Sequence, residues 1–524
     1  MKRVLVTVAS TGIGFLLIAR VSSMQGQVPQ RQMPQPPLGF RAAPIPPKPM
    51  SDEYLLLGDE TRGSGEAQIV VDPTDPRTIV ATGMGTWQIM PGCEAPDVNC
   101  KDFHNFPHST LPVSAITHDG GRTWEHFILP ILDAKFTRCP DPFAGATKDG
   151  ILIMGCEPRE TDPVKIDPFG EAAVVVSYDH GKTWGKRVDG INSYNRPPYP
   201  QFDKSLKPRF GGNSPWDRPW LYFDDTTDTI YLMNSGGETD IDTGSSGKYR
   251  TQSYFTASHD KAHSFRTIYA LDSLDWPQLT RASFAAGQGT IAEMYVARKV
   301  HASEGATCPC LVFGISSDEG KTWNRHVLKD VRVPPSASAR GGGGPDGGGI
   351  LGNLIADPTT PGRFSAMRYI ASPSPRYEVT TTTDDGKTWS EFVSVGSVPD
   401  AIGFIKPAWK YSRQAGVLGI VWKAVYPRDE SYEAWSAISK DGGRTFSAPL
   451  KISNGRSLPR QYYRDAHNDD NDGIDLTADD LYAVWGDTRA GFQGSWFAKV
   501  SLSSYRFGGK APTESSSIGP RNRQ

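Results

Sequence analysis

The stretch Thr117-His118-Asp119-Gly120-Gly121-Arg122-Thr123-Trp124 decides the fold, because the chain repeats its pattern, Ser/Thr-x-Asp-x-Gly-x-Thr-Trp. The copy at residues 258–265 has Ala262 in place of Gly and ends in Phe265, and the last copy ends in Phe446. Repetition of one short unit at long, similar intervals predicts a repeat architecture. The further copies occupy residues 177–184, 258–265, 316–323, 382–389 and 439–446.

The pattern is typical of a tight hairpin corner. Its Asp carboxylate can accept hydrogen bonds from backbone N–H groups of the same turn. Its Gly supplies the positive φ that such a turn requires. We expect the Thr to begin the returning strand, where β-branched residues are favoured. We expect the Trp to bury its ring between neighbouring units while its indole N–H finds a partner. The pattern therefore predicts architecture rather than chemistry.

Composition supports an all-β protein. The chain has 524 residues, with 54 Gly and 42 Pro for turns and 13 Trp and 19 Tyr for β-rich packing. Many turns and many aromatic residues favour numerous short strands. The formal net charge is −2, which gives no sequence-wide basic field. Nucleic acid is therefore not an expected partner.

The N-terminus is similar to a bacterial secretory signal peptide. Lys2 and Arg3 precede an apolar run, Val4–Ile18, and a small polar stretch follows it. Arg20 leaves an uncleaved anchor as the alternative. We expect a signal peptide over residues 1–26, a Pro-rich linker over 27–50 and a polar tail over 508–524. The protein is then secreted or periplasmic, with no membrane span after signal removal.

Six cysteines fit export. Cys93 with Cys100, and Cys139 with Cys156, are spaced to close loops. Cys308-Pro309-Cys310 is too short, by this reasoning, for an easy disulfide between its own members.

Residues 51–507 contain strand-like segments in series, which predict a single β-propeller of four-stranded blades. The first unit has strands near 67–71, 78–83 and 113–117 that lead into the first corner. Six corners give six blades directly. Segments at 473–476, 481–485 and 495–500 follow the last corner, and Tyr54–Leu57 at the other end can complete them. We favour seven blades, with six and an extra hairpin as the alternative.

The repeated corner resembles the Asp-box, or BNR repeat, of sialidases and related secreted propellers. The strand opening Asp217-Arg218-Pro219-Trp220-Leu221 is similar to openings in sialidase-like propellers of bacteria. The resemblance covers residues 60–500 and implies a propeller whose corners lie on the periphery, away from a central funnel that binds ligands. The same corner also occurs in other glycosidases, lyases and receptors, so it does not define the reaction.

A sialidase site implies three arginines that bind the substrate carboxylate, an Asp acid/base, and a Tyr nucleophile activated by Glu. The Phe/Tyr-Arg-Ile-Pro phrase that usually contains the first arginine is absent. Candidates come instead from the openings of innermost strands, and each has a structural role as its alternative. They are Glu66, Asp141, Asp217, Arg218, Arg281, Lys406, Arg464 and Asp465, with Tyr463 beside them.

The roles implied are specific. Arg218, Arg281 and Arg464 bind the carboxylate, Asp217 donates the proton and Tyr463 attacks. Either Glu433 or Glu293 activates the tyrosine, with the choice left open.

An acidic segment after this cluster has the spacing of a calcium loop. Asn468, Asp470 and Asp472 alternate before Gly473, and Asp479 falls at the twelfth position. The alternative is a solvated acidic loop that leads into a strand.

We therefore predict a secreted, carbohydrate-active propeller, in first place a sialidase-like glycoside hydrolase of the exo-α-sialidase type. A non-catalytic propeller that binds glycan or protein, and a polysaccharide lyase, are the alternatives. The expected partner is a carbohydrate or glycoconjugate. No cofactor is required, Ca²⁺ is an optional ligand, and the protein is expected to be a monomer.

Overall fold

The computed structural model describes residues 53–87, 110–160, 172–191, 216–239, 249–266, 268–271, 273, 275–280, 282–329, 331, 333, 352–413, 416–458 and 472–508. All of them belong to the compact unit Gly39–Gln524. The predicted signal peptide and linker, and the tail beyond Gly508, lie outside the described residues. Within the described part of the chain, no helix has both the length and the apolar character to cross a membrane.

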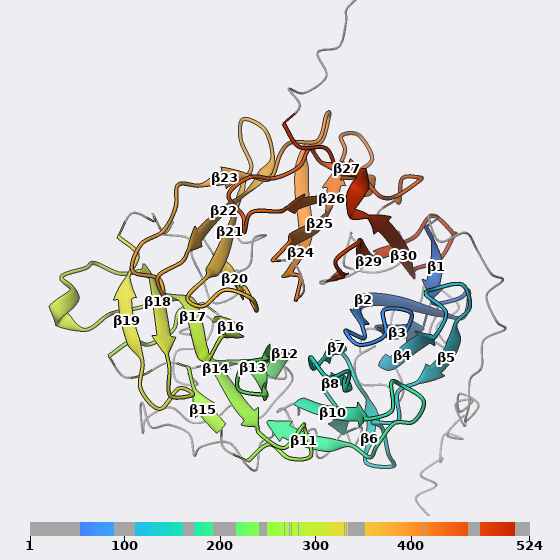
Figure 1. Cartoon of the computed structure of the whole chain (residues 1–524), viewed down its shortest axis with the longest axis horizontal. Helices are drawn as coiled ribbons and strands as arrows, with labels where there is room; N and C mark the ends of the chain where they lie inside the picture. Colours follow the sequence, from blue (N-terminus) through green and yellow to red (C-terminus); the bar gives the residue numbers. More distant parts are fainter. Residues whose placement is uncertain are drawn as a thin grey trace, which may run out of the picture. The chain divides into compact units, whose positions relative to one another are not determined.

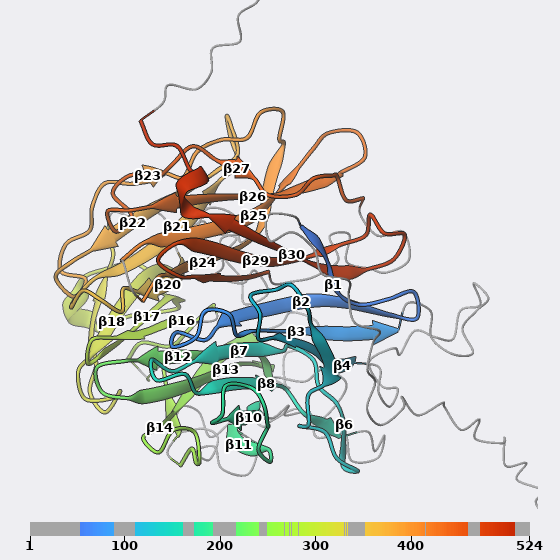
Figure 2. The same ribbon diagram turned by 45° about the vertical axis from the view of Figure 1, so that its right-hand side comes forward.

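Seven four-stranded antiparallel sheets form a β-propeller (Figures 1 and 2), which confirms the all-β prediction and the choice of seven blades over six. Blade 1 contains β2 (Arg62–Val71), β3 (Ile79–Trp87), β4 (Thr110–Thr117) and β5 (Glu125–Ile128). Blade 2 contains β7 (Phe143–Ala146), β8 (Leu152–Cys156), β10 (Ala172–Ser177) and β11 (Val188–Ile191). Blade 3 contains β12 (Trp216–Asp224), β13 (Thr229–Thr239), β14 (Tyr249–Ser258) and β15 (Ile268–Ala270).

The remaining blades follow the same order from the centre outward. Blade 4 contains β16 (Ser283–Gly287), β17 (Thr290–Ala297), β18 (Cys310–Ser316) and β19 (Asn324–Val327). Blade 5 contains β20 (Gly352–Ala356), β21 (Phe364–Ile370), β22 (Arg376–Thr382) and β23 (Val393–Ser394). Blade 6 contains β24 (Gly403–Tyr411), β25 (Leu418–Val425), β26 (Tyr432–Ser439) and β27 (Leu450–Lys451). Blade 7 contains β28 (Gly473–Leu476), β29 (Asp480–Asp487), β30 (Gly494–Ser501) and β1 (Tyr54–Leu57). A two-stranded ribbon of β6 (Phe136–Arg138) and β9 (Arg159–Glu160) and two short 3₁₀ helices, η3 (Ala302–Glu304) and η4 (Leu502–Ser504), complete the described elements.

The two ends of the chain close the ring in blade 7. β1 pairs antiparallel with β30, with Tyr54 opposite Phe497. The outermost strand of the last blade therefore comes from the N-terminal end, as the sequence predicted. The hydroxyl of Tyr54 also accepts a hydrogen bond from Trp124 Nε1, at 2.7 Å, and donates one to the Gly121 carbonyl, at 2.7 Å. This contact fastens blade 7 to the corner of blade 1.

The cores lie between blades rather than at the centre. Seven apolar clusters each join two adjacent blades. Both faces of a blade are therefore covered, and middle strands such as β8 and β25 are buried along their whole length. Sheets covered on both faces favour continuous apolar runs over alternation, and Leu152–Cys156 has this character. The innermost strands β2, β7, β12, β16, β20, β24 and β28 line the centre of the ring.

The repeated corner has the predicted turn geometry. Asp119 Oδ1 accepts hydrogen bonds from the backbone N–H groups of Arg122, at 2.9 Å, and Thr123, at 3.0 Å. Gly121 has φ +92°, and Ala262 adopts φ +65° at the equivalent position of the third corner. The ring of Trp124 is buried against blade 7. The turn prediction is confirmed, and Trp124 behaves as predicted. Trp323 and Trp389 are only half-buried, and within the described residues their indole N–H groups have no hydrogen-bond partner.

The corner Thr differs from its predicted role. The Thr123 hydroxyl donates to Asp119 Oδ2 at 2.7 Å, and β5 begins only at Glu125. The equivalent hydroxyl donates to the equivalent Asp in each of the other corners. The Thr is therefore selected for its hydroxyl, which closes the turn, rather than for strand propensity.

The disulfides confirm one prediction and correct another. Cys139 and Cys156 are bonded, as their spacing suggested. Cys308 and Cys310 also form a disulfide, with Cα atoms 4.3 Å apart, so the prediction that this pair is too short is wrong. The sequence argument considered only chain separation, whereas the backbone between the two residues brings their Cβ atoms together. Cys93 and Cys100 lie outside the described residues.

Candidate functional site

A β-bulge at the opening of the innermost strand recurs from blade to blade. In blade 1 the ladder passes from Gly65–Met84 to Gln68–Thr82, so Glu66 and Ala67 oppose one residue. Blades 3, 5 and 6 have the same shift, between Asp217 and Trp220, Gly352 and Ile355, and Ile405 and Ala408. Bulges redirect a side chain and are over-represented next to active sites. We call these positions the bulge ring, named by the first bulged residue of each blade.

In blades 2 and 4, backbone hydrogen bonds of the loop before the innermost strand show the same bulge. Glu157 N donates to the Pro140 carbonyl before the Phe143–Gly155 pair, which leaves Asp141 in the bulge. In blade 4, Thr280 N donates to the Val296 carbonyl before the Ser283–Met294 pair. The bulge ring thus contains the residues Glu66, Asp141, Arg218, Asn353 and Lys406. Arg281 lies outside the described residues.

The backbone of the bulge ring adopts a conformation that most residues avoid. Glu66, Asp141 and Lys406 each have φ +51°, and Asn353 has φ +54°. Non-glycine residues are uncommon in this left-handed region and are retained where the surroundings over-determine them, often at functional sites. The same conformation in four blades shows that the fold imposes it. The bulges therefore place polar residue types at one end of the innermost strands of blades 1, 2, 3, 5 and 6.

Charge is segregated around the ring. Blades 1 and 2 contribute the acidic residues Glu66 and Asp141, whereas blades 3 and 6 contribute Arg218 and Lys406. Glu66 is 9% exposed, and Asp141 and Lys406 are half-buried. Opposite charges on opposite arcs suit a ligand with an anionic group at one end and polar groups at the other.

Of the residues that the sequence placed on innermost strands, Glu66, Asp141, Arg218 and Lys406 lie at bulge positions of blades 1, 2, 3 and 6. Asp217 and Arg218 both lie in β12, with Arg218 in the bulge. Tyr463, Arg464 and Asp465 lie outside the described residues, so their roles remain predictions. Sequence reasoning missed Asn353. A polar residue followed by Pro or Ala precedes the strand in the other blades, whereas Leu354 follows Asn353 and breaks that signal.

The acidic arc is braced in blade 2. The Cys139–Cys156 disulfide ties the segment before Asp141 to the residue opposite the bulge. Glu157 follows directly, is fully buried, and pairs with Arg159 at 2.5 Å. Arg138 of β6 lies opposite Arg159 of β9 in the register of the ribbon. Burial lowers the pKa of Arg138 to about 10, and the positive charge of Arg159 acts in the same direction. A covalent bond and buried charges therefore fix the position of Asp141.

A buried ion pair lies next to the basic arc. Lys423 Nζ lies 3.0 Å from Asp472 Oδ1, and both side chains are almost fully buried. Lys423 pairs in register with Ile405, the residue before the Lys406 bulge. Removing both charges from water is costly, and their mutual attraction offsets that cost. Asp472, predicted as a calcium ligand, thus has an ammonium partner.

The other predicted calcium ligands are separated or undescribed. Strand β28 lies between Asp472 and Asp479, so these two residues are at opposite ends of a strand of about 13 Å and cannot bind one ion together. Asp479 is exposed in the turn before β29. Asn468 and Asp470 lie outside the described residues. Within the described residues, no group of three or more His, Cys, Asp or Glu is arranged to hold a metal.

Neither candidate activating glutamate belongs to the bulge ring. Glu433 Oε2 accepts a hydrogen bond from the Tyr426 hydroxyl at 2.6 Å, but Glu433 lies on the third strand of blade 6 and both side chains are buried. Burial and this contact raise the pKa of Tyr426. Glu293 is fully buried and pairs with Arg325 on the outermost strand β19, at 2.6 Å. A tyrosine with a raised pKa is a poor nucleophile, so Tyr426 and Glu433 fit a structural role.

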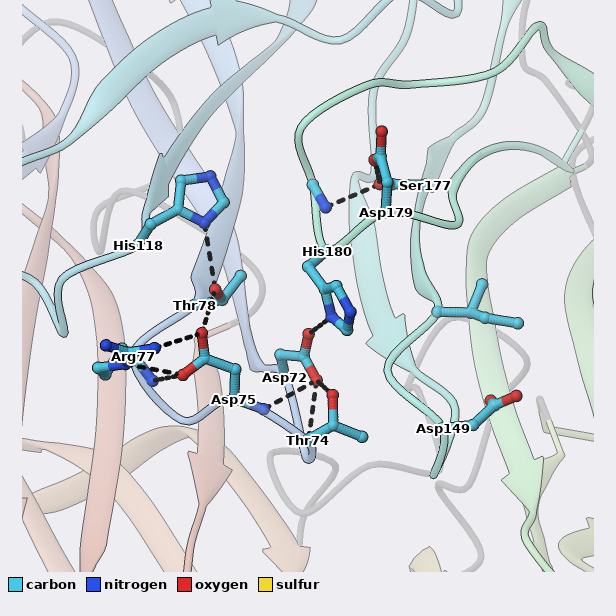
Figure 3. Close-up of polar contacts among 12 residues, drawn as sticks. Asp72, Thr74, Asp75, Arg77, Thr78, His118, Asp149, Ser177, Asp179 and His180 are labelled. Atoms are coloured by element: carbon cyan, nitrogen blue, oxygen red, sulfur yellow. Dashed lines mark hydrogen bonds and ion pairs between the residues drawn. The ribbon is translucent and has the colours of Figure 1, made fainter.

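A second polar network lies on the other end of the blades. Figure 3 shows the Asp72 carboxylate with the Thr74 hydroxyl, at 2.7 Å, and the His180 ring, whose Nδ1 lies 2.6 Å from Asp72 Oδ2. Asp72 follows β2 and His180 belongs to the second corner, so the pair joins blade 1 to blade 2. The Thr74 hydroxyl donates its hydrogen bond to Asp72 and is not available as a nucleophile. This network has a structural role.

Comparisons with known proteins return structural similarity without sequence similarity. No family model matches the chain, and no curated protein sequence matches it. A protein of unknown function from Dyadobacter fermentans is 13% identical, with a TM-score of 0.44, and the match covers 87% of this chain and 99% of that one. A sialidase from Streptococcus pneumoniae is 9% identical, with a TM-score of 0.40, and covers 86% and 96%. An ulvan lyase of a polysaccharide lyase family is 13% identical, with a TM-score of 0.43, and covers 86% and 98%. TM-scores below 0.5 assign no activity to this chain.

Proposed function

We propose that this protein is a secreted, carbohydrate-active propeller that binds an acidic glycan at its bulge ring. The observation that supports the proposal is the recurrence of one bulge with acidic residues in blades 1 and 2 and basic residues in blades 3 and 6. Arginine presents a planar fork that binds a carboxylate through two hydrogen bonds. An acidic sugar therefore fits with its carboxylate on the basic arc and its hydroxyl groups toward the acidic arc.

The reaction we propose is hydrolysis of an exo-α-sialidase type. Arg218, Arg281 and Arg464 bind the carboxylate, Asp217 protonates the leaving oxygen, and Tyr463 attacks the anomeric carbon. A neutral nucleophile avoids repulsion by the anionic sugar. Asp465, beside Arg464, orients it. Asp141, which is braced by the neighbouring disulfide, is a second candidate for the acid.

A polysaccharide lyase is the second candidate. The hydrogen-bonded Tyr426–Glu433 pair is buried and does not lie on the innermost strand of blade 6, which favours a reaction without that pair. A lyase uses the same basic arc to bind a uronate carboxylate, and a tyrosine or histidine removes the proton beside it. A propeller that only binds the glycan is the third candidate function.

Export is part of the proposal. The Cys139–Cys156 and Cys308–Cys310 disulfides support an oxidising compartment. We also propose that the chain acts as a monomer. Size-exclusion chromatography with light scattering tests this, and mass spectrometry of secreted protein locates the mature N-terminus.

The deciding experiment is incubation of the purified protein with fluorogenic sialosides of several linkages, next to an active sialidase. A parallel panel of uronate polymers is followed by the absorbance of newly formed carbon–carbon double bonds. Release of the fluorophore supports hydrolysis, and new absorbance supports the lyase. Binding of a glycan without either product supports a propeller that only binds the glycan.

The bulge ring is tested with Arg218→Ala and Lys406→Ala. A hydrogen bond to a charged group is worth about 1.5–3 kcal/mol, so each loss is expected to lower kcat/KM about 10- to 100-fold. Arg122→Ala, an exposed residue of the first corner, is the matched control and keeps full activity. Equal activity of all three variants contradicts the site.

A further inference from the structure

A cavity of about 560 Å³ lies between blades 4 and 5. One wall consists of Asn324 and His326 on β19 with Ser317 before them, and the other consists of Asp385 and Lys387 from the fifth corner. Small-molecule sites have volumes of about 300–1,000 Å³. We call this cavity the interblade pocket. It is large enough for a ligand of two or three rings.

The interblade pocket is separate from the bulge ring. The four strands of a blade are antiparallel, so the opening of the innermost strand and the corner between the third and fourth strands lie at opposite ends. The pocket residues Ser317, Asp385 and Lys387 all belong to corners. A ligand in this pocket therefore does not occupy the proposed reaction site.

The lining consists of groups that pair with hydroxyls. Asp385 offers carboxylate oxygens, Lys387 offers N–H donors, and Asn324 offers both kinds of group. Within the described residues, these three side chains form no hydrogen bond or ion pair with the protein. The single carboxylate and the single ammonium cancel in charge. Ile315 and the methyl groups of Thr290 and Thr322 add apolar surface beside these polar groups, so the lining suits a ligand with both hydroxyl groups and C–H faces.

A side-chain hydrogen bond joins the two walls of the interblade pocket. The His326 ring donates from Nε2 to the Gly386 carbonyl, at 3.0 Å, and so joins β19 to the fifth corner. Asp384 holds that corner through the N–H and hydroxyl of Thr388, at 2.9 and 2.7 Å. Because Nε2 is engaged with Gly386, Nδ1 is the ring nitrogen of His326 that remains for a ligand. These contacts hold the backbone of the corner and of β19 in place, so a ligand has to order only the lining side chains.

We propose that the interblade pocket is a second binding site for a neutral saccharide. A sugar presents adjacent hydroxyl groups that donate and accept, which matches an arrangement of carboxylate, amide, ammonium and hydroxyl groups. Because the charges of Asp385 and Lys387 sum to zero, the pocket favours an uncharged ligand. The site does not depend on the reaction proposed for the bulge ring, and it anchors the protein to a glycan while the centre remains open.

The test is direct binding to an array of neutral cello-, xylo-, manno- and galacto-oligosaccharides, followed by calorimetric titration of each hit with the full-length protein. Asp385→Asn keeps a residue type that tolerates the observed φ of +60° but removes the charge. Hydrogen bonds to charged groups are the stronger ones, so Kd is expected to rise about tenfold or more. Asn324→Ala and Lys387→Ala are expected to weaken binding in the same direction.

Two controls separate this site from the rest of the surface. Lys182→Ala changes the lysine at the equivalent position of the second corner and is expected to leave Kd unchanged. Arg218→Ala changes the bulge ring and is also expected to leave it unchanged. The proposal is overturned if no neutral oligosaccharide binds, if the three pocket variants bind as tightly as the parent, or if Arg218→Ala abolishes the same binding.

Discussion

The contact of Tyr54 with the first corner is expected to govern closure of the propeller. Its hydroxyl lies 2.7 Å from both Trp124 Nε1 and the Gly121 carbonyl oxygen, and Tyr54 and Trp124 are 3% and 4% exposed. Burial raises the pKa of Tyr54 to about 12, so the hydroxyl stays protonated at neutral pH. The substitution Tyr54→Phe keeps the ring and removes only this oxygen.

The expected cost follows from the two partners left behind. The Trp124 indole N–H and the Gly121 carbonyl both lose a buried hydrogen bond. A buried group without a partner costs about 1–3 kcal/mol, so Tyr54→Phe is expected to reduce the free energy of unfolding by at least about 2 kcal/mol. The loss falls on the blade that joins the two ends of the chain, and neither disulfide of the described residues spans that blade.

Urea denaturation of the full-length chain, followed by tryptophan fluorescence, measures this loss. Tyr178→Phe is the matched control, because its hydroxyl also joins two corners, at 3.0 Å from the Lys261 carbonyl and 3.1 Å from His263 Nδ1. Tyr178 is 46% exposed, so water replaces those bonds and the loss is expected to stay within about 0.5 kcal/mol.

A double-mutant cycle with Trp124→Phe sharpens the result. Tyr54 and Trp124 share one hydrogen bond, so the double variant is expected to lose less stability than the sum of the single variants. Equal losses for Tyr54→Phe and Tyr178→Phe, or full additivity in the cycle, refute the reasoning.

Three further predictions concern other parts of the fold. The Thr322 hydroxyl and N–H lower the pKa of Asp318 to about 2. The ionised Asp318 therefore stabilises the fold fully above pH of about 4, and this stabilisation disappears as the pH falls toward about 2. The melting temperatures of the parent and of Asp318→Asn should converge near pH of about 2. Gly320→Ala forces a Cβ to 2.4 Å from the Phe255 ring and is expected to cost more than about 2 kcal/mol by urea denaturation, whereas Gly289→Ala, with the same sign of φ and open space around it, costs only the backbone strain of about 1 kcal/mol. If residues 468–472 bind Ca²⁺, millimolar calcium raises the melting temperature and magnesium does not; no shift contradicts that prediction.

Much of the fold was predictable from local chemistry. Each corner contains its own hydrogen-bond acceptor, its positive-φ residue and its hydroxyl, so the pattern around Asp119 specifies the turn without long-range contacts. The count of seven blades needed one further inference, that Tyr54–Leu57 completes the last sheet. The error at Cys308 and Cys310 arose because two residues close in sequence were assumed to be unable to meet in space.

The candidate site was predictable in part. Strand openings gave Glu66, Asp141, Arg218 and Lys406, because a polar residue stands before an apolar strand in each blade. Asn353 lacks that signal and was found only through the register of β20 with β21. The roles of Glu293 and Glu433 depended on partners distant in sequence, Arg325 and Tyr426, that local patterns do not reveal.

The sequence by itself determined the repeated corner around Asp119 and, through its recurrence, a ring of blades closed by the N-terminal strand. The reason is physical: a turn is held by bonds among residues four or fewer apart, so its chemistry is readable locally. Only the tertiary structure decided which residues share the bulge ring, that Lys423 neutralises Asp472, and that a pocket opens between blades 4 and 5. Those features depend on strand register and blade packing, which join residues that the sequence keeps far apart.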